Sequence, residues 1–173
     1  MRSIELTLDD ATDAAVRREW LALQDAGIPS LVRNTSPSNR PHVTLFVAPA
    51  LRVDDLAAVR EAVSSLPMPL TLGATLLFGG HRRGYVLARQ VVVTTTLLEL
   101  HRRVHEAATP LAESVVPLSR PGAWTPHVTL ARRLDADSVG PALAAVGAAA
   151  LPTGAAPGAR LWDGVAKTVT PLT

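Results

Sequence analysis

The 173-residue sequence contains no cysteine, and Lys167 is its only lysine. The absence of thiols excludes disulfide frameworks, cysteine nucleophiles and cysteine-based zinc sites. All other cationic side chains are arginines, whose planar guanidinium groups pair well with phosphate oxygens. The net charge of +2 is nevertheless too small to indicate nucleic-acid binding by itself.

Aromatic residues make up only 3% of the chain, whereas a long binding track for single-stranded RNA normally needs several stacking platforms. No hydrophobic run approaches the roughly 20 residues that cross a bilayer, so we expect no membrane contact. The sequence turns acidic at Asp9 and Asp10, where a secretory signal would carry its apolar region. We therefore expect a cytoplasmic protein.

Hydrophobic periodicity predicts an alternation of strands and helices. Strands are predicted at 3–8, 41–48, 69–78, 84–93 and 125–133, and helices at 9–27, 53–66, 94–113 and 137–149. A strand pair is predicted within 159–172, and the Ala/Gly-rich stretch before it, 153–158, is interpreted as a connecting loop. The hydrophobic share of 47% is typical of a globular chain, and the length fits one domain.

The sequence Pro-His-Val-Thr-Leu occurs twice, at 41–45 and at 126–130. In each copy, strand geometry projects the histidine and the threonine from one face, so that both can contact a common ligand. Buried histidine and threonine side chains need hydrogen-bond partners, and the core position of an otherwise apolar strand does not need either residue. The repetition therefore indicates a polar cavity shared by two similar lobes.

Two imidazoles that face one cavity can supply a proton acceptor and a proton donor near neutral pH. Threonine hydroxyls can donate hydrogen bonds to the nonbridging oxygens of a phosphate. A metal-dependent hydrolase is an alternative, because histidine is a common metal ligand. Two histidines without a clear carboxylate or cysteine partner would leave a first-row metal underligated. We therefore expect phosphoester chemistry with no metal and no cofactor.

The paired motif resembles that of the 2H phosphoesterases, a family that includes 2'-5' RNA ligase-like proteins and cyclic phosphodiesterases. The family signature is two His-x-Thr motifs, each followed by a hydrophobic residue, and it is matched here by His-Val-Thr-Leu at 42–45 and 127–130. The resemblance implies that His42 and His127 are the acid and the base, respectively. It also implies that Thr44 and Thr129 anchor the phosphate.

Three further positions are candidate substrate contacts. An arginine often follows the second motif in the family, which favours Arg132, although strand alternation from Thr129 assigns Arg133 to the cleft unless the strand bulges. Alternation in the first motif strand places Phe46 on the face of His42, where it could stack on a base or pack between lobes. Trp124 could line the rim of the cleft or pack the preceding loop onto its lobe.

Two histidine-containing segments lie outside the paired motif. His101 and His105 are one turn apart on a predicted helix, and we expect them on a solvated face rather than in a metal site. His81, Arg82 and Arg83 occupy a predicted hairpin tip, where they could contact an RNA backbone or remain in solvent.

We expect an α+β fold in which residues 1–173 form one bilobal domain, with motifs at 42–44 and 127–129. Each lobe would be a mainly antiparallel sheet with helices on its outer face, and the active site would lie in the cleft between them. The expected function is metal-independent opening of 2',3'-cyclic phosphates of RNA ends or nucleotides to 2'-phosphates. The same chemistry with a ribose 5'-hydroxyl in place of water would give reversible 2'-5' RNA ligation.

Two alternatives remain open for the same cleft. One is an RNA-binding module without turnover, and the other is a family member that acts on the cyclic phosphate of a small metabolite. In each case we expect a monomer.

Overall fold

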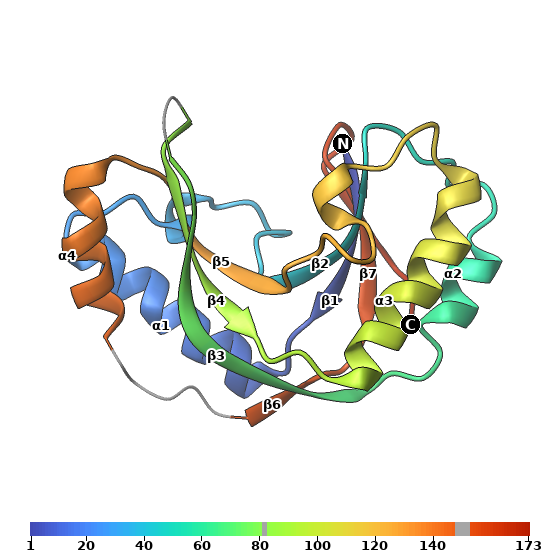
Figure 1. Ribbon diagram of the computed structural model, residues 1–173, viewed down its shortest axis with the longest axis horizontal. Coiled ribbons are helices and arrows are strands. Elements are labelled where there is room, and N and C mark those ends of the chain that lie inside the picture. Colours follow the sequence, from blue (N-terminus) through green and yellow to red (C-terminus); the bar gives the residue numbers. More distant parts are fainter. Residues whose placement is uncertain (81–82, 148–152) are drawn as a thin grey trace.

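The computed structural model describes residues 1–80, 83–147 and 153–173, and these form two four-stranded sheets flanked by helices (Figure 1). One sheet has the order β2-β1-β7-β8, and the other has the order β5-β4-β3-β6. Neighbouring strands are antiparallel throughout. The strands are β1 (Arg2–Thr7), β2 (His42–Ala48), β3 (Met68–Gly79), β4 (Tyr85–Val91), β5 (His127–Leu134), β6 (Thr153–Ala156), β7 (Ala159–Asp163) and β8 (Thr168–Pro171). The α+β architecture predicted from the sequence is confirmed.

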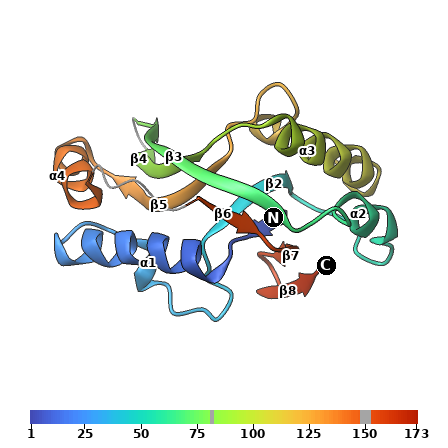
Figure 2. The same cartoon turned by 90° about the horizontal axis from the view of Figure 1, so that it is seen from below.

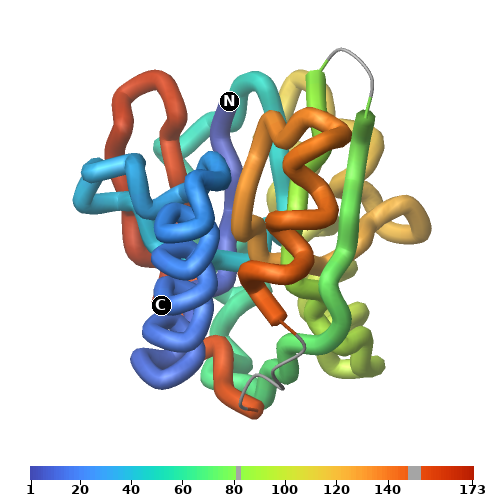
Figure 3. Tube along the Cα trace, turned by 90° about the vertical axis from the view of Figure 1, so that its left-hand side faces the viewer, coloured from blue at the N-terminus to red at the C-terminus, as the bar shows by residue number. Residues whose placement is uncertain are grey.

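The helices cover the outer sides of the two sheets. They are α1 (Asp10–Asp25), α2 (Ala57–Ala62), α3 (Thr95–Ala108) and α4 (Ala136–Val146). Helices α1 and α4 pack beside the sheet that contains β5, whereas α2 and α3 pack at the other end of the molecule (Figures 2 and 3). No helix in the described ranges is both long enough and apolar enough to cross a membrane.

The two halves of the chain interlock through these helices. Helix α1 follows β1 but packs against β5 of the other sheet, and α3 follows β4 but packs against β2. The motif strands β2 and β5 are the edge strands of their sheets and lie side by side (Figure 1). Two motifs far apart in the sequence therefore meet at the centre of the molecule.

A β-bulge interrupts the first motif strand directly after its threonine. Glu5 pairs with Thr44, but the preceding residue Ile4 pairs with Phe46, so Leu45 is the extra residue. A bulge reverses the alternation of side chains beyond it. Phe46 is consequently fully buried, whereas the sequence pattern placed it on the face of His42. The predicted alternation is correct up to Leu45 and wrong beyond it.

Four predicted elements differ from the observed ones, among them α3, which ends at Ala108 instead of 113. Residues 153–156 form β6, which pairs with β3 where a loop was predicted, because small residues without alternation carry no strand signal. Helix α2 covers only the middle of the predicted range 53–66. Helix α4 ends at Val146, where Gly147 adopts a φ of 62° that favours glycine. The predicted positions 148 and 149 lie outside the described residues.

The histidine pair on α3 is buried, which corrects the expected solvated face. His101 is 2% exposed and His105 is 5% exposed. His101 stacks on Trp124 with ring centroids 3.9 Å apart, and His105 packs against Phe46 at 4.9 Å. Helical spacing alone did not indicate burial, because the partners come from a loop and from the other sheet.

We predict that the buried pair makes stability depend on pH. Burial, together with the charge of neighbouring His105, lowers the pKa of His101 from 6.5 to about 4, and burial also lowers the pKa of His105. The unfolded chain therefore binds these protons more readily, so stability is fully present above pH 6.5 and is lost as the pH falls toward 4. His101 alone should reduce the free energy of unfolding by about 2 kcal/mol between pH 7 and pH 5.

Urea unfolding at a series of pH values measures this dependence. The variant His101→Gln retains a side-chain donor for the carbonyl of Ser119, which lies 2.9 Å from Nε2 of His101. It cannot titrate in this range, so its unfolding free energy should depend less steeply on pH. An unchanged slope in His101→Gln would show that another group controls acid unfolding.

Candidate active site

The two motif histidines have the same ring orientation. Nδ1 of His42 lies 2.7 Å from the carbonyl oxygen of Arg40, and Nδ1 of His127 lies 2.7 Å from the carbonyl oxygen of Thr125. A carbonyl oxygen can only accept, so Nδ1 carries the proton in both rings. The neutral rings therefore keep the Nε2 lone pair free for a ligand.

Two tryptophan indoles hold the motif strands from opposite halves of the chain. Nε1 of Trp20 on α1 donates to the carbonyl of Thr129 at 3.1 Å, and Nε1 of Trp124 donates to the carbonyl of Thr44 at 2.9 Å. Both acceptors immediately precede a bulge residue, where the ladder is disrupted. The indoles thus satisfy motif carbonyls at the point where each strand departs from regular pairing.

Trp124 packs the loop before β5 onto α3 and onto β2 of the other sheet, which is close to the packing role that the sequence analysis gave as one of two interpretations. Its ring stacks on His101, and His105 lies within hydrogen-bonding distance, 3.1 Å, of the carbonyl of Leu45 at the first bulge. Phe46 is enclosed in the core beside His105 and has no face free for a base. Phe46 therefore has no exposed surface with which to make the predicted contact with substrate.

A second bulge decides which arginine faces the first motif. In β5 the residue Leu130 is extra, because Ala88 pairs with Thr129 while the preceding residue Leu87 pairs with Ala131. The bulge shifts the alternation, so Arg132 lines the hollow that also contains His42. Arg133 is exposed and does not line this hollow.

The central hollow has a volume of about 320 Å³ and takes its walls from both sheets. His42, Thr44 and Arg132 contribute to these walls. His127 and Thr129 lie on β5 and are not part of its lining. The structure therefore brings His42, Thr44 and Arg132 together around one small space, and His127 is close enough to His42 and Arg132 for their charges to act on it.

Glu5 is a site residue that the sequence analysis missed. It is 3% exposed, and its Oε1 lies 3.6 Å from Nε2 of His42 and accepts a 2.6 Å hydrogen bond from the hydroxyl of Ser3. Its other oxygen, Oε2, is 2.9 Å from the buried guanidinium of Arg160. Glu5 belongs to the polar face of β1, and its alternation with Ile4 and Leu6 was the only sequence signal for an inward position.

His127 has a different electrostatic environment. Burial lowers its pKa; the hydrogen bond to Thr125 opposes this effect, and the charges of Arg132 and His42 add to the lowering. The ring also packs against Phe78 of β3, with centroids 4.8 Å apart. The neutral form of His127 is therefore favoured, whereas a carboxylate lies beside His42.

No group of three or more His, Cys, Asp or Glu side chains that could hold a metal ion occurs in the part of the chain that the structure describes. The pair formed by His42 and Glu5 supplies two potential donors, but Glu5 already interacts with Arg160 and Ser3. The arrangement is better suited to proton transfer than to metal coordination.

Comparisons with known proteins identify a family and a shared fold. The 2'-5' RNA ligase superfamily matches the chain over residues 12–162. No curated protein matches. Among solved structures, the protein TT0787 of Thermus thermophilus is 18% identical with a TM-score of 0.57, over 99% of this chain and 94% of that chain.

Usb1 of Kluyveromyces marxianus has a similar fold. Its structure is 14% identical with a TM-score of 0.55, over 99% of this chain and 96% of that chain. The structure of the same protein with uridine monophosphate is 15% identical with a TM-score of 0.53, over 99% and 97%. These identities establish similarity of fold. The family match, which extends over most of the chain and both motifs, shows that the chain belongs to the 2'-5' RNA ligase superfamily, which consists of 2H phosphoesterases.

Proposed function

We propose that the protein is a metal-independent phosphodiesterase that opens 2',3'-cyclic phosphates of RNA ends or nucleotides to 2'-phosphates. The observation that carries this proposal is the matched pair of histidines, each fixed through Nδ1 with Nε2 left for the substrate. Family membership supports phosphoester chemistry in this cleft. The uridine monophosphate in the related Usb1 structure is consistent with a nucleotide substrate.

In the proposed reaction, Nε2 of His127 removes a proton from water as its oxygen attacks phosphorus. The bond between phosphorus and the 3' oxygen breaks, and Nε2 of His42 transfers its proton to that oxygen. The product carries a 2'-phosphate and a free 3'-hydroxyl. Solvent exchange then restores both protonation states. A 5'-hydroxyl in place of water, with the same base and the same acid, would give the 2'-5' ligation, and the two roles would be exchanged in the reverse reaction.

The unequal surroundings of the two histidines support these roles. The carboxylate of Glu5 lies 3.6 Å from Nε2 of His42 and is itself paired with Arg160. Burial and Arg132 keep the pKa of His127 low, which favours a neutral base. Arg132 and the hydroxyls of Thr44 and Thr129 would hold the negative charge on the phosphoryl oxygens.

We predict that His42→Ala and His127→Ala each lose at least about 10²-fold in turnover of a short RNA with a 2',3'-cyclic end, because each removes a proton-transfer group. The reaction is run in excess EDTA, and the position of the product phosphate is identified. Thr44→Val should also lower turnover, whereas the matched Thr44→Ser, which keeps the hydroxyl, should retain more of it.

Two results would contradict the proposed function. Binding of the RNA without turnover by the wild-type protein would identify a binding module. Turnover that appears only after metal is added would assign the histidines to metal coordination. Turnover of a small cyclic phosphate with no turnover of RNA would instead retain the chemistry and change the substrate.

We further predict that Glu5→Gln lowers kcat/KM, because His42 loses the carboxylate oxygen that lies 3.6 Å from its Nε2. Glu5 is not among the causes of the pKa shift of His127, so the variant should act through His42. The measurement is kcat/KM for the short RNA with a 2',3'-cyclic end.

The matched control is Glu19→Gln. Glu19 forms a buried ion pair with Arg89 of β4, with a 2.8 Å contact from Arg89 Nε, and it does not line the hollow that contains His42. Breaking either buried pair should cost about 3 kcal/mol of stability, but only Glu5→Gln should lower kcat/KM. If Glu5→Gln does not fold, the double variant with Arg160→Met removes both charges. An unchanged kcat/KM in Glu5→Gln would exclude the role of Glu5.

A further inference from the structure

A second hollow, of about 790 Å³, lies beside the central hollow that contains His42 (the catalytic hollow) and shares Arg132 with it. Arg83, at the start of the segment that leads into β4, and Arg133 also line it. We refer to Arg83, Arg132 and Arg133 as the arginine surface. Arg132 thus extends from the catalytic hollow to a larger and more open surface.

The backbone is specialised to present these arginines. Arg133 has a φ of 61°, a left-handed conformation that favours glycine. A register shift in β5 leaves it unpaired between Arg132 and Leu134, so two consecutive arginines are both exposed. A Cβ on Gly84 would lie 2.7 Å from the carbonyl oxygen of Leu134, which shows how closely the two strands approach here. An arginine kept in a strained conformation indicates that its side chain serves a function.

The charges of the arginine surface are available to a ligand. Within the described ranges, none of the three arginines forms an ion pair. Asp135 is the carboxylate that lines the same hollow, and its Oδ1 accepts a 2.8 Å hydrogen bond from the backbone amide of Ser138 at the start of α4. The hollow therefore has three cations and one carboxylate that is already engaged.

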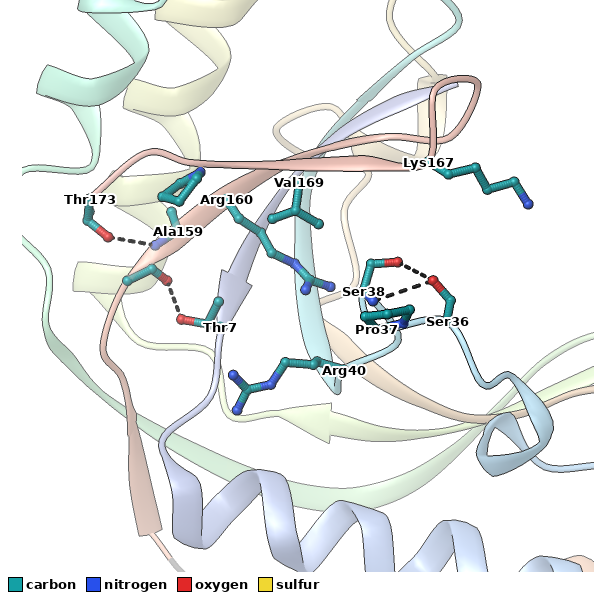
Figure 4. Close-up of a pocket in the computed structure, with 12 residues that line it drawn as sticks. Thr7, Ser36, Pro37, Ser38, Arg40, Ala159, Arg160, Lys167, Val169 and Thr173 are labelled. Carbon is teal, nitrogen blue, oxygen red and sulfur yellow. Dashed lines mark hydrogen bonds between the residues drawn. The ribbon is translucent and has the colours of Figure 1, made fainter.

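A rival hollow of about 560 Å³ flanks the catalytic hollow on another side and contains Arg40, Arg160 and Lys167 (Figure 4). Its two arginines are already paired. Arg40 Nε is 3.3 Å from Asp13, and Arg160 is 2.9 Å from Glu5. Lys167 points away from the other labelled side chains (Figure 4). The arginines of the rival hollow are already paired, whereas those of the arginine surface form no ion pair within the described ranges. The arginine surface is therefore the better candidate for binding an anion.

We propose that Arg83 and Arg133 bind the RNA backbone on the 5' side of the terminal nucleotide, so that the preferred substrate is an oligoribonucleotide rather than a cyclic mononucleotide. A chain that ends in a 2',3'-cyclic phosphate continues only on its 5' side. Its next phosphate must therefore leave the catalytic hollow, and Arg132 connects that hollow with the arginine surface. Guanidinium groups suit phosphate oxygens. This inference rests on the proposed function.

Arg83 is the described member of the hairpin tip predicted from the sequence, and it lines the hollow. His81 and Arg82 lie outside the described residues.

The test compares two substrates, a cyclic mononucleotide and a short RNA with the same terminal nucleotide and a 2',3'-cyclic phosphate. The variants are Arg83→Ala and Arg133→Gly, with Arg133→Lys as the version that keeps the charge. Arg18→Ala removes an exposed arginine on α1 that lines neither hollow, and Lys167→Ala probes the rival hollow.

We expect Arg83→Ala and Arg133→Gly each to lower the ratio of oligonucleotide to mononucleotide kcat/KM by about tenfold, because each loses a charged hydrogen bond to phosphate. The dependence of log kcat/KM on log salt concentration should become shallower by about 0.7 for each lost contact. Arg133→Gly should keep or raise the thermal midpoint, because glycine accepts the positive φ. If Arg133 had only a structural role, Arg133→Gly would not lower the substrate ratio while keeping the thermal midpoint.

The outcomes distinguish the inference from the proposed function. Wild-type hydrolysis of both substrates with unchanged ratios in Arg83→Ala and Arg133→Gly would overturn the inference and retain the function. A fall in the ratio for Lys167→Ala instead would assign the strand to the rival hollow, and an equal fall for Arg18→Ala would indicate only a general charge effect. Failure of the wild type on both substrates would overturn the proposed function itself.

Discussion

The site depends on backbone carbonyls that the motif strands cannot pair within their own sheets. Strands β2 and β5 are edge strands, and each bulges directly after its motif threonine. An unpaired buried carbonyl costs about 1–3 kcal/mol, so a donor from elsewhere is needed. Trp20 and Trp124 provide one donor to each strand, and each comes from the opposite half of the chain. The packing of the two tryptophans therefore also holds the motif strands in position.

A motif threonine followed by a bulge residue occurs in both β2 and β5, but the residues around this feature differ between the two strands. At the position that pairs with the motif threonine, β1 carries Glu5 whereas β4 carries Ala88. Three residues after the threonine, β2 carries Val47 whereas β5 carries Arg132. The negative group thus lies beside His42, and the positive group acts on His127. A repeated backbone frame with different substituents thus gives the two histidines different electrostatic surroundings.

The sequence was sufficient to predict the α+β fold and the paired motif, because both rest on local patterns of polarity and on a repeated sequence. It was not sufficient where one extra residue changes the side-chain face. Phe46 and Arg132 both lie beyond a bulge, so strict alternation gave the wrong face for each. Burial of His101 also depends on a distant partner, Trp124, and Glu5 acquires its charge partner from β7. Such long-range contacts leave no periodic signal.

Both bulges also explain how a strand can serve the core and the cleft at once. A regular strand that places His and Thr on one face would place Arg133 there and leave Arg132 on the buried side, where a guanidinium would need a partner. The extra Leu130 keeps Val128 and Leu130 in the core and turns Arg132 toward the hollow. The strained residue Arg133 then points to solvent instead of returning to the core. The bulge and the strained residue together thus place two consecutive arginines at two neighbouring hollows, Arg132 at both and Arg133 at the larger one.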